Sequence, residues 1–179
     1  KISSLYLTPD DIHIQNVVVI PARKTTGDND LIKMALMKYG AVATSHHADF
    51  DKSKYFNGVA QYYTGDKPAD HTVCIVGWDD NYPKDNFKTH APGDGAWIVK
   101  NSWGTDWGDG GFFYVSYYDT SFAADDNIAF ILTNDTYNRI YQNDVGGLGE
   151  WSDDAKYYAN AFTAEADELI AAVGTFFEK

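Results

Sequence analysis

The chain has very little cysteine, no long apolar run and no excess of positive charge. Cys74 is the single cysteine among 179 residues, so no disulfide can form within the chain and the fold has to stand without one. No stretch approaches the roughly 18 consecutive apolar residues of a membrane-spanning helix. Lys and Arg number 14 against 26 Asp and Glu, a formal net charge of −12, which disfavours nucleic acid and anionic membrane surfaces as partners.

The composition otherwise describes an ordered domain. Apolar residues make up 44% and aromatic residues 16%, which excludes disorder over most of the length. The 13 Tyr and 5 Trp favour β structure, since aromatic rings suit a half-buried pleated surface. Lys1 leads straight into Ile2-Ser3-Ser4, which is no signal-peptide pattern, and an opening lysine fits a processed chain or a fragment.

Hydrophobic patterning predicts one helix among many short strands. Apolar residues recur at helical spacing between Leu31 and Tyr39, with Asp28 or Asp30 as the expected cap and Gly40 as the expected end. Strands are expected at 14–20, 41–47, 72–78, 96–100, 112–118 and 127–132. This pattern predicts an α+β fold, an antiparallel barrel or sandwich with one helix.

The composition and the hydrophobic pattern of the chain change near Asn134. A polar, glycine-containing stretch is followed by strand-like patterning at 157–163 and 168–177, close to the end of the chain at Lys179. We therefore expect two domains, residues 1–134 and residues 135–179, of which the second is the start of a truncated all-β module.

Two short segments carry the residues suited to chemistry. His71 stands at the beginning of an apolar strand, directly after Asp70. The second segment is a strand that ends in Lys100-Asn101-Ser102-Trp103-Gly104 and continues into a loop rich in tryptophan and glycine. A polar amide that closes an apolar strand must find a partner or remain costly, so packing alone does not account for it.

In order and spacing, these segments resemble the histidine strand and the Asn-Ser-Trp-Gly motif of papain-like cysteine peptidases. The helix around Leu31 with Gly40-Ala41-Val42, and Phe112-Phe113-Tyr114-Val115, are similar to the neighbouring elements of that family. The likeness covers about residues 14–133, the β-rich half of such an enzyme. It implies a papain-like right-hand domain and an endopeptidase that acts on proteins or peptides without a cofactor.

The resemblance also implies roles for individual residues. His71 would be the general base, and Asn101 would accept a hydrogen bond from its other ring nitrogen, as the third member of a Cys-His-Asn triad. Trp103 would cover that bond and exclude water, and Asp70 would favour a protonated imidazole. Trp107 would lie on the leaving-group side of the cleft. Thr72 and Ser45 would line the main specificity pocket.

The nucleophile of the family is missing. Neither a Cys-Gly-Ser-Cys-Trp-like segment nor the glutamine that precedes it occurs in the chain. Cys74 is three positions from His71 on one strand, so alternation directs the two side chains to opposite faces, and we expect Cys74 to be a core residue. The chain alone is therefore expected to be inactive, with the nucleophile-bearing half as a partner.

The remaining polar residues favour no metal site. His46 and His47 are neighbours on a strand, face opposite ways and are expected to be surface histidines. The acidic loop around Asp79 and Asp80 lacks the alternating ligand pattern of helix–loop–helix calcium sites.

The tail, through segments such as 157–165, resembles the opening of the lectin-like β domain of prokaryotic surface-associated members of the family. This would imply a secreted or cell-surface protein and carbohydrate as a possible second partner.

Two functional hypotheses remain open from the sequence. The first hypothesis is a thiol endopeptidase whose cysteine lies outside this chain. The alternative is a non-catalytic peptide- or carbohydrate-binding module derived from such a peptidase.

Overall fold

A computed structural model describes residues 13–50, 54–133, 141, 161–170 and 173. The chain divides into two units, Lys1–Thr133 and Asn134–Lys179, which are described separately. The first unit carries every helix and strand that the described residues form.

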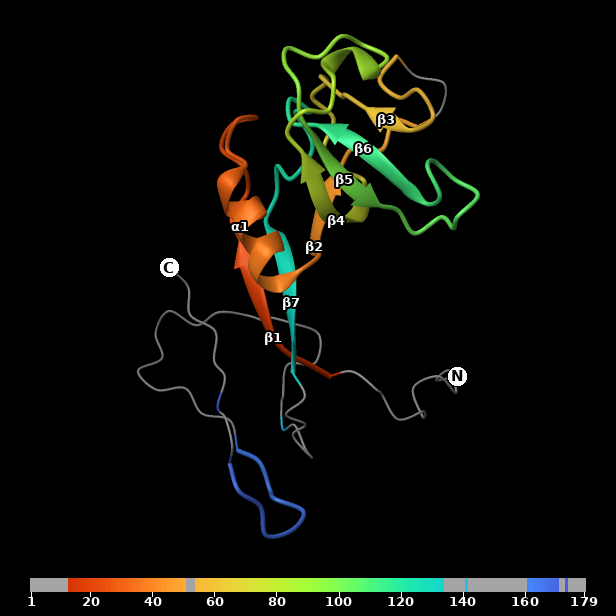
Figure 1. Ribbon diagram of the computed structural model, residues 1–179. Coiled ribbons are helices and arrows are strands. Elements are labelled where there is room, and N and C mark those ends of the chain that lie inside the picture. The colour runs from red at the N-terminus through yellow and green to blue at the C-terminus, as the bar shows by residue number, and fades with distance from the viewer. Residues whose placement is uncertain (1–12, 51–53, 134–140, 142–160, 171–172, 174–179) are drawn as a thin grey trace. The chain divides into compact units, whose positions relative to one another are not determined.

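The first unit is built on one mixed sheet. Its strands in chain order are β1 (His13–Ile20), β2 (Val42–His46), β3 (Ala60–Gln61), β4 (His71–Asp79), β5 (Ala96–Lys100), β6 (Phe112–Ser116) and β7 (Asn127–Thr133). Their order in the sheet is β1-β7-β2-β4-β5-β6-β3, and all pairs are antiparallel except β3 with β6. The helix α1 (Asp30–Tyr39) lies beside β1, β7, β2 and β4 (Figure 1).

The six strands predicted for this unit and its helix are confirmed, with ends that shift by two residues at most. The two-residue strand β3 and a 3₁₀ turn at Lys84–Asn86 were not predicted. Both are too short to leave a periodic pattern of apolar residues, which is the signal on which strand and helix prediction depends.

Asn29 caps α1, so the prediction of Asp28 or Asp30 as the cap is wrong. The Asn29 side chain makes no hydrogen bond to the helix, because its Oδ1 accepts one from Arg23 Nη1 at 3.0 Å. The Asp28 carboxylate instead accepts the Lys24 N–H. The helix ends at Gly40, whose φ of 87° favours glycine, and Gly40 N–H donates to Leu36 O.

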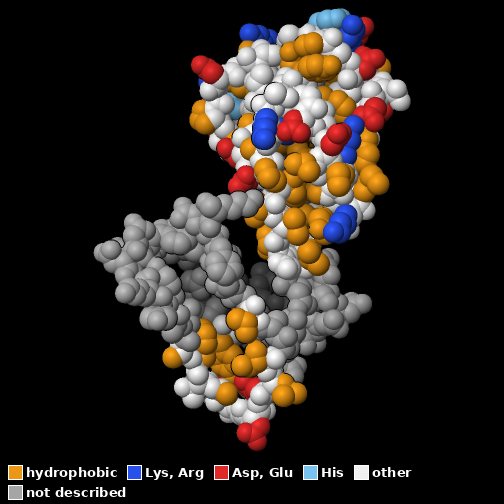
Figure 2. Space-filling model, turned by 90° about the vertical axis from the view of Figure 1, so that its left-hand side faces the viewer, with side chains coloured by type: hydrophobic (Ala, Val, Ile, Leu, Met, Phe, Trp, Pro, Cys, Tyr) orange, Lys and Arg blue, Asp and Glu red, His pale blue; other side chains and the backbone are white. Residues whose placement is uncertain are grey.

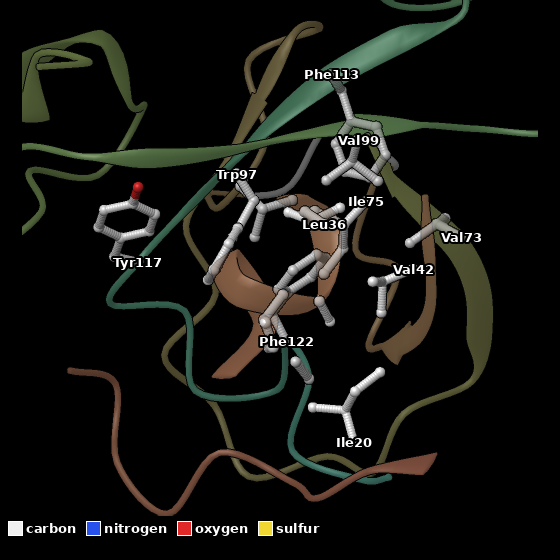
Figure 3. Close-up of a cluster of buried hydrophobic side chains, with 14 of the residues drawn as sticks. Ile20, Leu36, Val42, Val73, Ile75, Trp97, Val99, Phe113, Tyr117 and Phe122 are labelled. Carbon is white, nitrogen blue, oxygen red and sulfur yellow. The ribbon is translucent and has the colours of Figure 1, made fainter. Parts of the chain in front are cut away.

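The core lies between α1 and the sheet. Figure 3 shows Leu36, Ile75, Trp97 and Phe122 in its middle, with Phe113 beside Val99 at one end and Ile20 at the other. The fully buried apolar residues include Val42, Ile75, Trp97, Val99, Phe113, Val115 and Phe122. Burial of a side chain of this size stabilises the fold by about 1.5–3 kcal/mol relative to exposure, so these residues carry much of the stability of the unit.

One outer surface of the first unit is unusually apolar. On the side that carries α1, Figure 2 shows apolar side chains gathered over the first unit. The exposed apolar residues of α1 and β1 are Leu31, Met34, Met37, Ile14, Val17 and Val19. An exposed apolar area of this kind is a candidate contact surface.

The tail does not form the predicted strands where the structure describes it. Residues 161–163 and 168–170 are described and lie in no strand, and Leu169 and Ile170 are 96% and 85% exposed. The other residues of the two predicted tail strands, except Val173, lie outside the described residues.

Candidate functional site

His71 and Asn101 lie together at one edge of the sheet. His71 is the first residue of β4, and Asn101 follows Lys100, the last residue of β5. Because β4 and β5 are antiparallel, the start of one strand and the end of the other meet at the same edge. His71 Nε2 is 2.9 Å from Asn101 Oδ1, a hydrogen-bond distance.

This hydrogen bond determines where the imidazole carries its proton. Asn101 Oδ1 also accepts the Ser102 N–H at 2.8 Å, so the oxygen, and not the amide nitrogen, faces the histidine. Since an amide oxygen can only accept, the His71 hydrogen is on Nε2, and the neutral ring has its lone pair on Nδ1. Nδ1 is then the atom that can take a proton from another group.

Aromatic rings enclose the His71–Asn101 pair. The centroid of the Trp103 ring is 5.2 Å from that of His71, and Trp103 itself is 50% exposed. Phe50 meets the His71 ring edge to face at 6.2 Å and also contacts Trp103 and Trp107. Asn101 is buried. In such a setting water competes poorly, and the hydrogen bond is stronger than in solution.

Glycines give the loop that carries Trp103 and Trp107 its tight path. Gly108 has a φ of 61°, and a Cβ at this position would lie 2.4 Å from Phe112 O. Gly111 has a φ of 91° and accepts the Asn101 N–H through its carbonyl oxygen. Any other residue type would strain this backbone, so the glycines position Asn101. Trp107 stacks on Phe56 at 5.6 Å.

Ser45 and Thr72, the predicted pocket residues, are cross-strand neighbours on β2 and β4. Ser45 Oγ donates a hydrogen bond to Asp125 Oδ2 at 2.9 Å. Asp125 borders a hollow of about 230 Å³ between the segments 65–69 and 120–125. The structure thus adds a carboxylate to the predicted pocket residues, and this carboxylate comes from a loop 80 residues away in sequence.

Asp70 directs its charge to His47. Asp70 Oδ2 is 2.9 Å from His47 Nδ1, an ion-pair distance without hydrogen-bond alignment, and Oδ1 accepts the Ala48 N–H. Burial raises the pKa of the Asp70 carboxyl, but the hydrogen bond from Ala48 and the His47 charge outweigh this and hold the pKa below its ordinary value. The contact that the structure shows for this charge is with His47, and its expected action on His71 stays a prediction.

The prediction that His46 and His47 are surface histidines is wrong. His46 is fully buried among Phe50, His71, Phe113 and Phe122, and His47 is buried against the Tyr63 ring at 4.8 Å. His46 is the last residue of β2, and His47 is covered by Tyr63 and bonded through its N–H to Ser121 Oγ, both from distant segments, so alternation does not expose either ring. Burial, and secondarily the neighbouring His71, lower the pKa of His46 to about 3.

Comparison with known proteins decides the family. The sequence matches the papain family of cysteine proteases over residues 10–129, which include His71 and Asn101. The chain belongs to this family. Its sheet-rich fold with few helices agrees with that assignment, so the papain-like fold expected from the sequence is confirmed for the first unit.

The sequence relatives of the chain include cathepsin B-like cysteine proteinases. It is 33% identical over 82 residues to the cathepsin B-like cysteine proteinase 1 of Ostertagia ostertagi, which covers 46% of this chain and 21% of that protein. It is 29% identical over 123 residues to the cathepsin B-like cysteine proteinase 3 of Caenorhabditis elegans, covering 68% of this chain and 30% of that protein. The chain thus spans less than a third of these relatives.

A solved structure resembles the chain more fully. This is the structure of the cysteine protease and lectin-like domains of Cwp84, a surface layer associated protein of Clostridium difficile. The two are 34% identical with a TM-score of 0.63, and the match covers 75% of this chain and 29% of the other.

In this papain-family chain, Cys74 faces away from His71. On β4 the buried residues are Val73 and Ile75, which alternate with the half-exposed Cys74, and the strand partners of Cys74 are Ala43 and Lys100. Cys74 is absent from the core, so its prediction as a core residue is wrong, although its predicted orientation is confirmed. Burial of its flank raises the pKa of the thiol and disfavours the reactive thiolate.

Sequence reasoning missed Phe50 and Asp125. Phe50 sits in a loop without periodicity, and Asp125 is one of two adjacent acidic residues before β7, so neither has a local signal that links it to His71 or Ser45. Within the described residues, no group of three or more His, Cys, Asp or Glu side chains could hold a metal ion. No helix in this part of the chain is long and apolar enough to cross a membrane.

Proposed function

We propose that this chain supplies the general base of a cysteine endopeptidase, with His71 as the base and Asn101 as the residue that orients it. The observation that carries the proposal is the 2.9 Å contact between His71 Nε2 and Asn101 Oδ1, which leaves Nδ1 for a thiol. Membership of the papain family supports the same reaction class.

In this proposal His71 moves one proton twice. Nδ1 takes the proton of a cysteine thiol, and the thiolate attacks the carbonyl carbon of the peptide bond. The protonated ring then gives the proton to the leaving amine, and a water molecule hydrolyses the thioester by the same route. Asn101 accepts the Nε2 hydrogen throughout and so keeps the ring in one orientation.

The surrounding residues would bind substrate. Trp103 covers the His71–Asn101 hydrogen bond, and Trp107 belongs to the side of the cleft where the leaving group departs. Ser45 and Thr72 are assigned to the main specificity pocket; they are cross-strand neighbours next to His46 and His71, where β2 ends and β4 begins.

The nucleophile lies outside this chain. The only cysteine present is Cys74, whose side chain alternates to the face opposite His71 and whose thiol is held neutral by burial. We infer that a second, nucleophile-bearing half completes the enzyme, and that residues 1–134 alone do not hydrolyse peptides. The alternative of a non-catalytic binding module requires that this half lack the cysteine.

The tail and the location of the protein belong to the same proposal. Residues 135–179 begin a lectin-like β domain, and the protein is secreted or attached to the cell surface. The similarity to Cwp84 supports both statements, since that structure contains lectin-like domains and that protein is associated with a surface layer. Carbohydrate is then a second class of ligand.

The test uses the intact natural protein and an epoxide-type inhibitor of thiol proteases. We expect one covalent label per molecule, on a cysteine other than Cys74, located by peptide mass spectrometry. Asn101→Ala and His71→Ala are expected to slow labelling by at least about 100-fold, because general base catalysis contributes roughly 10²–10⁴-fold.

The matched control is His90→Ala. His90 is an exposed histidine that pairs with Asp85 and has no contact with the site, so labelling is expected to persist. Label on Cys74, or no label on an intact protein, would rule out the peptidase and favour the binding module.

A further inference from the structure

The loop between β6 and β7, residues 117–126, lies against the pocket proposed for Ser45. Its segment 120–125 borders a hollow of about 230 Å³. Two hydrogen bonds tie the loop to β2. Ser45 Oγ donates to Asp125 Oδ2 at 2.9 Å, and the Ala123 N–H donates to Ser45 O at 3.1 Å. The path of the loop therefore decides where the Asp125 carboxylate lies.

The loop takes a strained path at Ala123. The φ of Ala123 is 55°, in the left-handed region that residues with a side chain rarely adopt, and no other non-glycine residue in the described part of the chain has a positive φ. Ala123 is also fully buried. Such a conformation persists only where the surrounding structure enforces it. Contacts from other segments must therefore hold the loop in this path.

Arg23 supplies most of these contacts. It lies just after β1, and its main-chain N–H donates to Ala123 O at 3.0 Å. Its guanidinium donates from Nε to Phe122 O at 3.1 Å, from Nη1 to Tyr117 O at 3.0 Å and from Nη2 to Asp119 O at 2.9 Å. One residue thus donates to four carbonyl oxygens of a loop that is distant in sequence.

The guanidinium suits this contact because of its geometry. Its planar fork presents N–H donors in several fixed directions, whereas a lysine ammonium is a single point of charge. No carboxylate forms an ion pair with Arg23 among the described residues, and the remaining acceptor of its side chain is Asn29 Oδ1. The positive charge of Arg23 therefore acts mainly on the carbonyl oxygens of the loop.

A buried carboxylate holds the N–H groups of the same loop. Asp119 is fully buried, and its Oδ1 accepts the N–H groups of Ser121 and Phe122. Arg23 thus binds the loop through its carbonyl groups, and Asp119 binds it through its N–H groups. Asp119 belongs to the loop itself, so Arg23 is the charged residue that fixes the loop to another segment.

We propose that Arg23 is a positioning residue of the specificity pocket, which holds the loop in its strained path and so sets the Asp125 carboxylate beside Ser45 to select a cationic side chain of the substrate. This inference rests on the proposed function. Without the guanidinium, three carbonyl oxygens lose their donors, and Ala123 is free to leave the left-handed region. The carboxylate then loses its fixed place, and the preference for a cationic side chain falls.

The test compares two peptides, hydrolysed by the intact natural protein, that differ only in arginine or leucine at the residue that enters this pocket. We expect Arg23→Met to lower the ratio of kcat/KM for arginine over leucine by about threefold to fivefold, no more than the loss of the carboxylate itself. Arg23→Lys keeps the charge but not the fork, and is also expected to lower the ratio. It carries the test if Arg23→Met does not fold.

A double variant distinguishes positioning from a general loss of structure. If Arg23 acts through the Asp125 carboxylate, Arg23→Met has no further effect on the ratio in an Asp125→Asn background. A general loss of structure would instead lower kcat/KM for both peptides alike and leave their ratio unchanged. Losses of the ratio that add in the double variant would overturn the inference, as would an unchanged ratio in Asp125→Asn alone.

The matched control is Lys24→Met, which removes a positive charge at the next residue. The Lys24 side chain is exposed, and the three side-chain hydrogen bonds to the loop carbonyls come from Arg23. Loss of a nearby positive charge by itself favours a cationic substrate, so we expect Lys24→Met to leave the ratio unchanged or to raise it. An unchanged or raised ratio in both Arg23 variants would overturn the inference, as would an equal loss in Lys24→Met.

Inhibitor labelling of the same samples separates this inference from the proposed function. Wild-type protein that is labelled and active, with a ratio that does not move in the Arg23 variants, would defeat only the role of Arg23. Wild-type protein that takes up no label and hydrolyses neither peptide would defeat the peptidase, and with it the role of Arg23 in specificity.

Discussion

Acidification from pH 7 to pH 5 is expected to destabilise the first unit through His46. The folded-state pKa of His46 is about 3, whereas the ordinary value is 6.5. Below pH 6.5 the unfolded chain binds a proton at this residue and the folded chain does not. The contribution of neutral His46 to stability is therefore complete above pH 6.5 and is lost progressively as the pH falls toward 3.

The magnitude follows from the difference between the two pKa values. Each pH unit below 6.5 removes about 1.4 kcal/mol, so the free energy of unfolding falls by about 2 kcal/mol between pH 6.5 and pH 5. This is a large fraction of the roughly 5–15 kcal/mol by which a domain is stable. The lowered pKa values of Asp70 and Asp80 act below pH 3.8. Burial raises the pKa of Asp119, which therefore acts above pH 3.8 with the opposite sign, so the contribution of His46 is taken from the difference between the wild type and a His46 variant.

The assay is urea unfolding at pH 7 and pH 5, followed by tryptophan fluorescence, which reports on the buried Trp97. His46→Gln removes the titrating group and is expected to reduce the loss of stability between the two pH values by about 2 kcal/mol. His90→Gln, at an exposed site, is the control and should behave as the wild type. A loss of stability that is the same in His46→Gln and the wild type would refute the burial of a neutral His46.

Two further substitutions test the pocket and the core. In the intact protein, Asp125→Asn is expected to lower kcat/KM by about fivefold for peptides with arginine, relative to leucine, at the specificity pocket proposed for Ser45. The reason is that an exposed ion pair contributes up to about 1 kcal/mol, and an unchanged ratio would contradict the prediction. Asp119→Asn is expected to destabilise the first unit by about 3 kcal/mol in urea unfolding. Both oxygens of the fully buried Asp119 side chain accept hydrogen bonds, from Gln61 and Tyr63 N–H at Oδ2 and from two further residues at Oδ1. An amide has one oxygen only, so the donors at the other position lose their acceptor. A change in the free energy of unfolding below about 0.5 kcal/mol, the size expected for a surface substitution, would contradict the prediction for Asp119.

The sequence by itself determined the elements and the pair of motifs. The strand at Ala96–Lys100 and the helix between Leu31 and Tyr39 could be predicted because their apolar residues repeat with the period of the element that they form. His71 and Asn101 could be paired because their two motifs resemble, in order and spacing, the histidine and asparagine motifs of papain-like peptidases, whereas each residue alone would be read as structural. The backbone of the Asn101 loop is likewise encoded locally, by glycines such as Gly108.

Only the tertiary structure decided which side chains surround these motifs. Alternation shows that His46 and His47 face opposite ways, but not that both sides of β2 are covered at its end. The register of β2 against β4, which sets His46 opposite His71, follows from packing between segments 25 residues apart. Asp125 reaches Ser45 across 80 residues for the same reason. Local patterns specify periodicity, whereas burial and contact depend on long-range packing of the whole sheet.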